Sequence, residues 1–427
     1  MLHTLYRGLT HLSGPAIQYY LARRKAAGKE DPVRHPERLG EASRLRPHGR
    51  LVWCHAASVG ESLSILVLID RLLALDPGLS VMVTTGTVTS AELMGRRLPL
   101  RAFHQYIPVD HPAWVARFLD HWQPDLALWV ESEIWPNLLW EIGRRHIPAA
   151  LINARLSARS YARWRRLPGL IRDLLAPFHL ILAQTEADAG RLMHLSRRDV
   201  VPLGNLKFSS EPPPADAADL ARLGALTDSR PVWLFASTHP GEESLAAEVH
   251  QTLASRLPDL LTLVVPRHPH RGEEVAMLLA AGGLTVSRRS IGDQPVPTDA
   301  IHVGDTLGEM GLYYRLAPVV CMGGSFIPHG GQNPVEPARL GCAIVYGPHM
   351  FNFGEVTAQL EAADAALSVA DAASLAEVVG LLLTDDAERR RRAAAAQAVA
   401  ERNTQVVDLT VTALRPLLAE AGLPVTP

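Results

Sequence analysis

Short apolar runs recur along this chain, and each is followed by small or polar residues and then by a helical stretch. In the first half the runs cover 51–55, 81–85, 126–130, 149–153, 180–184 and 200–203. In the second half they cover 232–236, 261–265, a weaker segment near Thr285, and 317–322. Continuous β-branched runs of this length are typical of strands buried on both faces of a parallel sheet. The alternation predicts an α/β fold built from doubly wound, Rossmann-like sheets.

Two such domains are expected, because 427 residues exceed what one typical core holds. Three consecutive prolines, 212–214, indicate a linker between them. The predicted parts are an N-terminal segment over 1–30, a first domain over 31–205, a linker over 206–216, a second domain over 217–400, and a final helix over 401–427 that crosses back to the first domain.

The first 30 residues combine leucines and tyrosines with Arg7, Arg23, Arg24 and Lys25. Basic residues around aromatic and leucine side chains suit an anionic membrane surface, so we expect this segment to associate with membranes. A helical hairpin packed on the protein body is the alternative. The chain holds no run of 18 apolar residues, so a membrane-spanning helix is not expected.

Composition excludes several classes of function. The net charge of −2 provides no basic field for nucleic acid. Cys54, Cys321 and Cys342 each lie in an apolar run without metal-ligand spacing, which favours reduced, buried thiols in a cytoplasmic protein. The 18 histidines are scattered and form no HExxH pattern, so a metal site is not expected.

Polar loops follow the predicted strands, and in parallel sheets ligands bind at the carboxyl ends of strands. The richest stretch is 304–355. Gly323 and Gly324 end its apolar strand, and Asn333 stands at the expected N-cap of a short helix over 334–340. Glu336, one turn into that helix, can accept hydrogen bonds from a ribose. Tight turns and a favourable charge near the helix dipole are the alternative explanations.

Other strand ends supply further candidates. Ser237 and Thr238 precede a helix, and Arg267 can pair with a phosphate in bidentate fashion. Glu61 lies beside small residues after the first strand and suits a general base facing an acceptor hydroxyl. Neither a Gx4GK[ST] loop nor a GxGxxG after the first strand is present. Transfer of a sugar from an activated nucleotide therefore fits better than phosphoryl or hydride transfer.

Ten motifs in order resemble those of the 3-deoxy-D-manno-octulosonic acid (Kdo) transferases of lipopolysaccharide assembly. They are HAASVGES at 55–62, ESEIWPNLL at 131–139, NARLSARS at 153–160, GNLKFS at 204–209, STHPGEE at 237–243, PRHPHR at 266–271, GDTLGEMGLYY at 304–314, GGS at 323–325, GGQNPVEPA at 330–338 and GPHMFNF at 347–353. Each motif alone is weak, whereas ten in register are specific.

The resemblance implies a GT-B glycosyltransferase, in which two Rossmann-like domains face each other across a cleft. It implies CMP-Kdo as the donor substrate, a lipid A precursor as the acceptor, inversion at the sugar, no metal and no other cofactor. The location implied is the cytoplasmic face of the inner membrane, with the chain peripheral or anchored by its N-terminus.

The resemblance also assigns residues. Glu61 matches the family's base and Glu131 a second carboxylate, for which hydrogen bonding that holds its loop is the alternative. Arg155 can pair with Glu131 or meet the donor carboxylate. The other substrate- or nucleotide-binding residues expected are Ser58, Gly60, Lys207, Ser237, Thr238, Arg267, His268, Gly323, Gly324, Ser325, Asn333 and Glu336.

The sequence departs from the family's pattern at Gln332, where histidine is usual, at His270, where glutamate is usual, and over 84–90. Two other interpretations stay open. One is a different GT-B enzyme, such as a nucleotide-sugar 2-epimerase or another transferase. The other is a non-catalytic nucleotide-binding scaffold, against which the presence of Glu61 argues.

Overall fold

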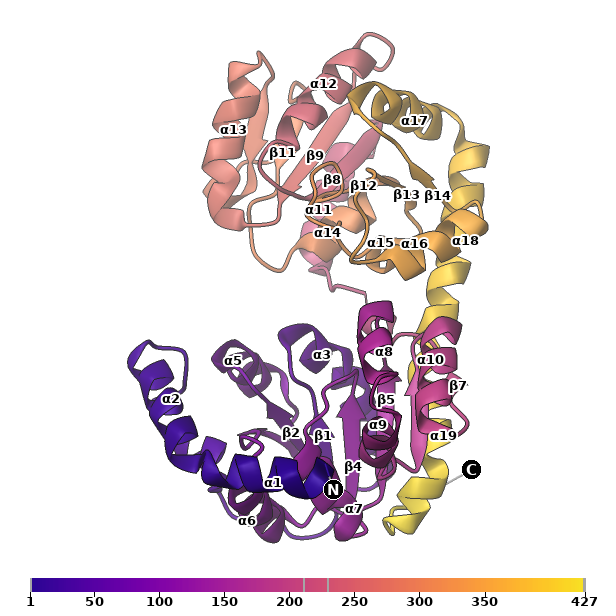
Figure 1. Ribbon diagram of the computed structural model, residues 1–427. Coiled ribbons are helices and arrows are strands. Elements are labelled where there is room, and N and C mark those ends of the chain that lie inside the picture. The colour runs from indigo at the N-terminus through magenta and orange to yellow at the C-terminus, as the bar shows by residue number, and fades with distance from the viewer. Residues whose placement is uncertain (1, 210–211, 229, 425–427) are drawn as a thin grey trace. The chain divides into compact units, whose positions relative to one another are not determined.

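The computed structural model describes residues 2–209, 212–228 and 230–424 (Figure 1). The chain divides into two compact units, one comprising 1–210 and 403–427 and the other 211–402. Residues 210 and 211 of the expected linker lie outside the described residues. We describe each unit separately.

Unit 1 is built on a seven-stranded sheet in the order β3-β2-β1-β4-β5-β6-β7, and every pair of neighbours is parallel. The strands are β1 Leu51–His55, β2 Ser80–Thr85, β3 Ala102–Tyr106, β4 Leu126–Val130, β5 Ala149–Ala154, β6 Leu180–Ala183 and β7 Val201–Pro202. The prediction missed β3, because this edge strand alternates half-buried and buried residues and so lacks a continuous apolar run.

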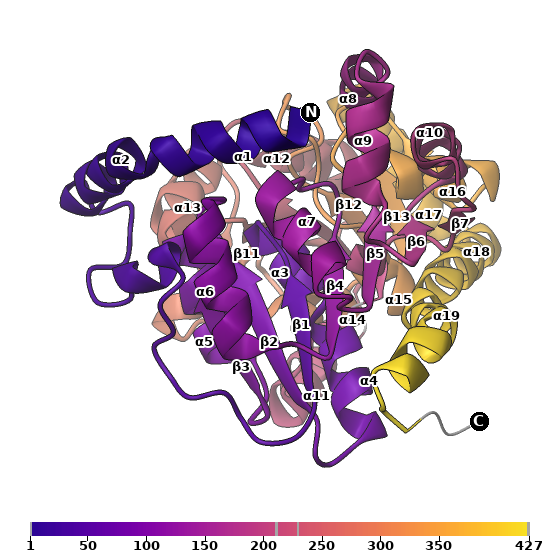
Figure 2. The same ribbon diagram turned by 60° about the horizontal axis from the view of Figure 1, so that its bottom comes forward.

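Helices cover both faces of this sheet (Figure 2). They are α1 Leu2–Leu12, α2 Gly14–Ala26, α3 Val59–Ser64, α4 Leu66–Leu75, α5 Val88–Arg97, α6 Pro112–Trp122, α7 Pro136–Arg144, α8 Ala158–Trp164, α9 Pro168–Leu175, α10 Glu186–Ser196 and α19 Val406–Glu420. Short 3₁₀ turns span His35–Leu39 and Leu206–Phe208.

The strand period of two divides the core of unit 1 into two apolar clusters. Trp53 belongs to the cluster covered by α6, α7, α9 and α10, whereas its neighbour Val52 belongs to the cluster covered by α4, α5 and α19. Helix α19, from the end of the chain, buries Leu414 and Leu418 in this second cluster. The first unit is therefore completed by residues more than 400 positions from its start.

Unit 2 repeats the plan with the strand order β10-β11-β9-β8-β12-β13-β14, again parallel throughout. The strands are β8 Val232–Thr238, β9 Leu261–Pro266, β10 Val286–Arg288, β11 Ile301–Val303, β12 Val319–Met322, β13 Ala343–Tyr346 and β14 Ala366–Ser368. The sequence did not indicate β11, β13 or β14, which are at most four residues long. The doubly wound α/β prediction is confirmed in both units.

The helices of unit 2 are α11 Ala217–Thr227, α12 Glu243–Ala254, α13 Gly272–Ala281, α14 Met310–Leu316, α15 Val335–Arg339, α16 Gly354–Ala362, α17 Ala372–Thr384 and α18 Asp386–Thr404, whose last residues belong to unit 1. Short 3₁₀ turns span Pro269–Arg271 and Arg289–Ile291. The expected helix over 334–340 is shorter than predicted. It begins at Val335 with Pro334 at the N-cap, one position later than expected, and the Asn333 side-chain oxygen accepts the Val335 N–H at 3.1 Å.

Helix α1 of the N-terminal segment contacts the rest of unit 1 through polar groups. The Tyr6 hydroxyl donates to Asp110 at 3.0 Å, and Arg7 pairs with Glu141 at 3.0 Å. Within the described residues, no helix is both long and apolar enough to cross a membrane.

Candidate active site

Glu61 lies in the first turn of α3, directly after β1. Ser58 caps this helix: its Oγ accepts from the Glu61 backbone N–H at 3.3 Å and donates to Glu61 Oε1 at 2.8 Å. The second carboxylate oxygen, Oε2, accepts from the Ala57 backbone N–H at 2.8 Å. The cap therefore fixes the carboxylate at the carboxyl edge of the sheet.

The surroundings of Glu61 shift its pKa upward. Burial raises the pKa of Glu61, and the nearby charge of Glu131 raises it further, whereas the hydrogen bonds from Ser58 and Ala57 act in the opposite direction. The residue retains 8% exposure. Two bonded oxygens still leave lone pairs that can accept a substrate hydroxyl. A partly accessible carboxylate with a raised pKa is suited to proton transfer.

Glu131 follows β4 and pairs with Lys207, whose Nζ lies 2.9 Å from Glu131 Oε1. The Lys207 side chain also lies against Gly60, since its Cε would be 3.8 Å from a Cβ at that position. Glu131 has a φ of 62°, a backbone conformation that L residues rarely adopt. Strained residues of this kind cluster at functional sites.

A chain of buried amides holds Lys207 in place. Asn153, at the end of β5 with a φ of 50°, accepts from the Leu206 N–H at 3.0 Å and, through its carbonyl, from Gln184 at 3.1 Å. Gln184 accepts from Asn205 at 3.2 Å, and Asn205 in turn accepts from the Lys207 N–H at 3.0 Å. Sequence reasoning missed Gln184 and Asn205 as supports, because Gln184 joins Asn153 and Asn205, which lie 31 and 21 positions away from it along the chain.

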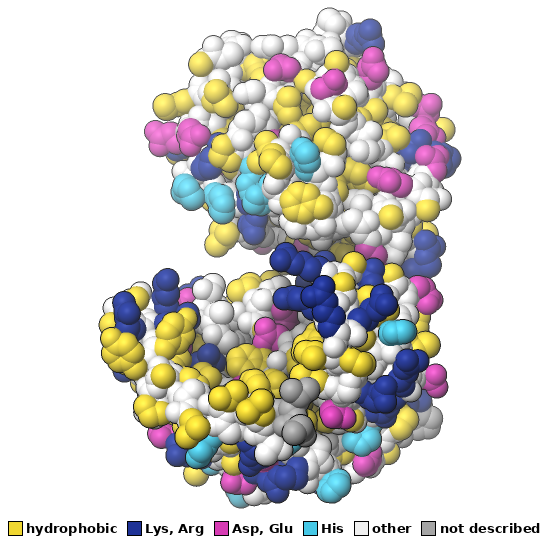
Figure 3. Space-filling model, in the orientation of Figure 1, with side chains coloured by type: hydrophobic (Ala, Val, Ile, Leu, Met, Phe, Trp, Pro, Cys, Tyr) yellow, Lys and Arg dark blue, Asp and Glu magenta, His cyan; other side chains and the backbone are white. Residues whose placement is uncertain are grey.

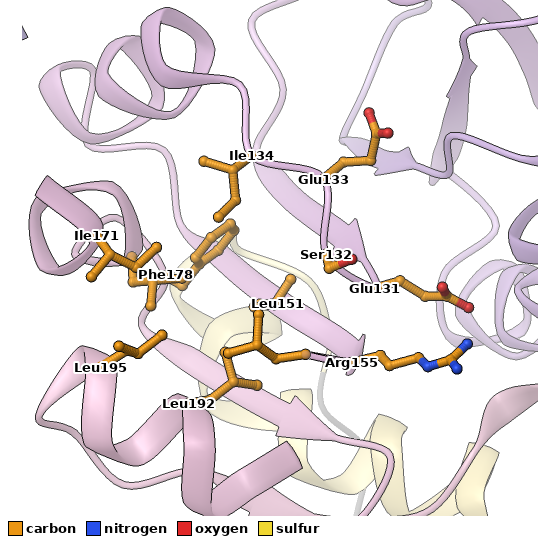
Figure 4. Close-up of a pocket in the computed structure, with 12 residues that line it drawn as sticks. Glu131, Ser132, Glu133, Ile134, Leu151, Arg155, Ile171, Phe178, Leu192 and Leu195 are labelled. Atoms are coloured by element: carbon orange, nitrogen blue, oxygen red, sulfur yellow. The ribbon is translucent and has the colours of Figure 1, made fainter. Parts of the chain in front are cut away.

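Arg155 is exposed and does not form the pair with Glu131 that was one of its two expected roles, since the partner of Glu131 is Lys207. Both side chains stand at the rim of a small pocket, and Figure 4 shows them directed away from its apolar interior. That interior is lined by Ile134, Leu151, Leu156, Ile171, Leu175, Phe178, Leu192 and Leu195. Unit 1 thus brings together Ser58, Gly60, Glu61, Glu131 and Lys207, with Arg155 beside Glu131.

In unit 2 a pocket of about 260 Å³ opens at the carboxyl ends of β8, β9 and β11. It brings together four predicted residues, Ser237, Arg267, Asn333 and Glu336, and Gln332 also lines it. Burial raises the pKa of Glu336, while a hydrogen bond from Asn333 and the charge of Arg267 oppose that shift. The Asn333 amide lies 3.3 Å from Glu336 Oε1. An arginine and a carboxylate in one pocket suit a ligand with both anionic and hydroxyl groups.

The glycine turn after β12 presents no free amides at Gly324, Ser325 and Phe326, which corrects the expectation that Gly323, Gly324 and Ser325 bind substrate or nucleotide. Glu242, which is fully buried, accepts the backbone N–H groups of Gly324, Ser325 and Phe326 at 2.7, 3.0 and 3.0 Å. It also accepts the His239 N–H at 2.9 Å. Gly323 is required because a Cβ there would lie 2.3 Å from the Ser237 carbonyl oxygen. This turn therefore binds an internal carboxylate.

The remaining predicted residues of unit 2 lie outside the pocket. Thr238 is buried and donates to Glu243, which pairs with Arg271 at 2.7 Å. Ser325 is buried and donates to the Met322 carbonyl. His268 is exposed, 6.1 Å from the His239 ring. Gln332, which does line the pocket, contacts His239 at 3.2 Å.

His239 belongs to a group of histidines that the prediction did not use. Its ring centroid lies 4.0 Å from that of His329. Burial lowers the pKa of His239 to about 4, assisted by the positive surroundings. Among the described residues, no group of three or more histidine, cysteine or acidic side chains is placed to hold a metal ion.

Sequence comparison identifies the family. Residues 33–210 match the family model described as 3-deoxy-D-manno-octulosonic-acid transferase (kdotransferase). A 3-deoxy-D-manno-octulosonic acid transferase of Bordetella pertussis is 35% identical, covering 94% of this chain and 96% of its own. One from Rickettsia bellii is 31% identical, covering 95% and 97%. This chain belongs to the Kdo transferase family. The resemblance of the ten motifs is thereby confirmed, and the chain is a glycosyltransferase of a family that serves lipopolysaccharide biosynthesis.

Solved structures share the fold. A glycosyltransferase from Rickettsia africae covers 87% of this chain with a TM-score of 0.58 at 12% identity. A UDP-GlcNAc 2-epimerase from Neisseria meningitidis covers 86% with a TM-score of 0.57 at 14% identity. The GT-B fold class is confirmed by these likenesses. Because transferases and epimerases share it, the fold does not choose between them, whereas the sequence relatives are transferases.

Proposed function

We propose that this Kdo transferase moves Kdo from CMP-Kdo onto a hydroxyl of a lipid A precursor, with inversion and without a metal. Glu61 takes the proton of the acceptor hydroxyl while the oxygen of that hydroxyl forms a bond to the anomeric carbon of Kdo. The bond from that carbon to the phosphate oxygen breaks, and CMP leaves with the electron pair. One observation supports this proposal above the others: Glu61 is partly buried with a raised pKa, yet remains accessible.

Glu131 and Lys207 have supporting roles in this scheme. In addition to burial, the charge of Glu131 raises the pKa of Glu61, which makes Glu61 a stronger base. Lys207, fixed by the amide chain, places a positive charge between Gly60 and Glu131. A fixed cation beside the reacting groups stabilises charge that develops during transfer.

The unit 2 pocket is proposed to hold the donor. Arg267 suits the phosphate of CMP, since a guanidinium matches phosphate oxygens in bidentate fashion. Glu336 and Asn333 suit the ribose hydroxyls. Ser237, whose φ of 58° is unusual, lines the same pocket.

The N-terminal helices are proposed to rest on the cytoplasmic face of the inner membrane. Leu5, Leu9 and Leu12, at positions i, i+4 and i+7 of α1, are 59%, 59% and 79% exposed. Tyr19 and Tyr20 of α2 are also exposed, and Arg23 and Lys25 follow them. Figure 3 shows hydrophobic side chains gathered over α1 and α2. Apolar and basic residues together suit an interface with anionic lipid.

Mass spectrometry of the lipid product tests the proposal. The full chain is incubated with a lipid A precursor and with CMP-Kdo generated in the assay. A mass gain of one or more Kdo units is expected, and it also counts the additions. No gain with CMP binding intact would point to another acceptor or to a non-catalytic scaffold. If neither the mass gain nor CMP binding is found, the alternative of a different GT-B enzyme, one that uses a uridine nucleotide, becomes the preferred interpretation.

A further inference from the structure

The segment that follows β5 carries an unbalanced positive charge. Between Glu141 and Asp173 the chain contains no acidic residue. This absence is local, because the whole chain is nearly balanced, with a net charge of −2. Five exposed arginines fall within 155–166, on and around α8: Arg155, Arg159, Arg163, Arg165 and Arg166. Figure 3 shows Lys and Arg side chains gathered over this helix. Local charge of one sign marks a binding surface for the opposite sign.

None of these five arginines forms an ion pair with any residue that the structure describes, and the Arg165 guanidinium lies 5.6 Å from the centre of the Tyr161 ring. The arginine run of α18 is different. There Arg389, Arg390, Arg391 and Arg392 all pair with Asp386, Glu388 or Asp364. The α18 arginines are thus neutralised within the protein, and those of α8 are left for a ligand.

Arg159 and Arg163 stand four residues apart in α8 and so project from the same side of the helix. Like charges at this spacing destabilise a helix. Burial does not compensate for this repulsion, because no residue of α8 is buried. An anion bound between the two guanidinium groups would relieve the repulsion.

The position of the arginines relates them to the acceptor. Arg155 begins the series beside Glu131, at the carboxyl edge of the unit 1 sheet (Figure 4). We propose that Arg159 and Arg163, with Arg165 and Arg166, bind a phosphate group of the lipid acceptor while its hydroxyl lies at Glu61. This inference rests on the proposed function, in which the acceptor is a lipid A precursor; the resemblance to Kdo transferases implies that this precursor is a disaccharide bisphosphate.

Phosphate is the group that best fits this surface. Guanidinium forks match phosphate oxygens, and several arginines can share one phosphate. The apolar pocket under the segment is not an acyl-chain site, since its cavity of about 20 Å³ holds little more than one water molecule. The recognised feature is therefore the charge of the headgroup.

The test compares three acceptors in non-ionic detergent micelles: one with both phosphates, and two that each lack a different one of the phosphates. For Arg159→Gln/Arg163→Gln the KM for the bisphosphorylated acceptor is expected to rise about tenfold, with kcat within about twofold. The KM for the monophosphorylated acceptor should rise much less when the missing phosphate is the one bound here. Removing each phosphate in turn identifies which one it is.

A matched control removes the same charge elsewhere in unit 1. Arg96→Gln/Arg97→Gln changes two exposed arginines at the end of α5, for which a KM unchanged within about twofold is expected. Lysine at 159 and 163 should restore part of the affinity. If the first variant is unfolded by circular dichroism, Arg165→Gln/Arg166→Gln, beyond the end of α8, decides the question with the same readout.

Three outcomes would overturn the inference. The first is an unchanged KM in folded variants of both pairs. The second is an equal rise of KM for all acceptors, which indicates general charge attraction. The third is that the variant no longer sediments with phosphatidylglycerol vesicles while its KM in micelles is unchanged, which indicates a membrane contact. A separate competition experiment with inorganic phosphate distinguishes a site for free phosphate from a site for the phosphate of the lipid. If the unaltered protein transfers Kdo to no acceptor, it is the proposed function that fails.

Discussion

The two units place a glutamate in the same part of their folds and use it in different ways. β1 and β8 are the strands that come first along the chain in their units, and both lie inside their sheets. Each leads into a turn with a glutamate that accepts a nearby backbone N–H. From the residues that the structure describes, Glu61 accepts one further bond, from the Ser58 hydroxyl, and it keeps some exposure. Glu242 accepts three more backbone N–H groups from the loop after β12 and is fully buried.

This difference separates a reactive carboxylate from a structural one. Four fixed N–H donors satisfy both oxygens of Glu242 and join two loops, so the side chain has no capacity left for a substrate. Glu61 is under-bonded by comparison, and burial raises its pKa. A carboxylate at a strand end is a candidate base only when backbone amides do not already saturate it.

The largest expected effect is the loss of transfer in Glu61→Gln. The amide cannot take the acceptor proton, so kcat should fall about 10²- to 10⁴-fold. CMP affinity, measured by calorimetry, should be retained because the proposed donor pocket lies in unit 2. Glu92→Gln, an exposed position on α5, serves as the control. Undiminished turnover in the Glu61→Gln variant would remove Glu61 from the mechanism.

Glu242→Gln should act on local stability. The amide keeps one acceptor oxygen and turns an NH₂ group toward two backbone donors, which costs about 3 kcal/mol. Hydrogen exchange of residues 324–326, followed by mass spectrometry, should then be about a hundredfold faster. Glu248→Gln, exposed on α12, should leave this exchange unchanged. Protection equal to that of the unaltered protein would show that Glu242 does not hold the loop.

The fold could be predicted because it depends on local patterns. Apolar runs of four to six residues, separated by helical stretches, indicated most strands, and only short or edge strands such as β3 and β13 escaped. Glu61 was found because it follows the first strand beside small residues, and its partners Ala57 and Ser58 are likewise neighbours in sequence.

What escaped depends on contacts between distant residues. The turn at Gly323 and Gly324 resembles an anion cradle, and its actual partner, Glu242, lies about 80 positions upstream. The pairing of Lys207 with Glu131 is likewise non-local. Arg155, which is closer to Glu131 in the sequence, was therefore the partner considered from the sequence. A glycine pattern predicts which backbone can approach a group, and only the packed structure identifies that group.

Glu131→Gln sharpens the comparison through pH. Beyond the effect of burial, the charge of Glu131 raises the pKa of Glu61, so its removal should lower that pKa, and Lys207, released from its pair, should lower it further. A base works in its deprotonated form, and its rate falls as pH drops through its pKa. The acid limb of kcat/KM should therefore move to lower pH. An acid limb at unchanged pH would show that the charge of Glu131 does not affect the pKa of Glu61.

Ser58→Ala should give the smallest effect, and in the opposite direction. Against the effect of burial, the Ser58 hydroxyl lowers the pKa of Glu61, so its loss should raise that pKa and move the acid limb to higher pH. Loss of the cap should also cost about 1 kcal/mol of stability, measured as a lower Tm.

Thr185→Ala controls for the cap alone. Thr185 caps α10 and donates to Asp188, three residues on, as Ser58 does to Glu61. Its loss should therefore lower Tm by a similar amount without shifting the pH profile. If both variants shift the acid limb equally, the shift reports a loss of stability. If only Ser58→Ala shifts the acid limb, the cap sets the basicity of Glu61. The Ser58 hydroxyl is then the group that makes Glu61 differ from Glu242, which is bonded by backbone N–H groups.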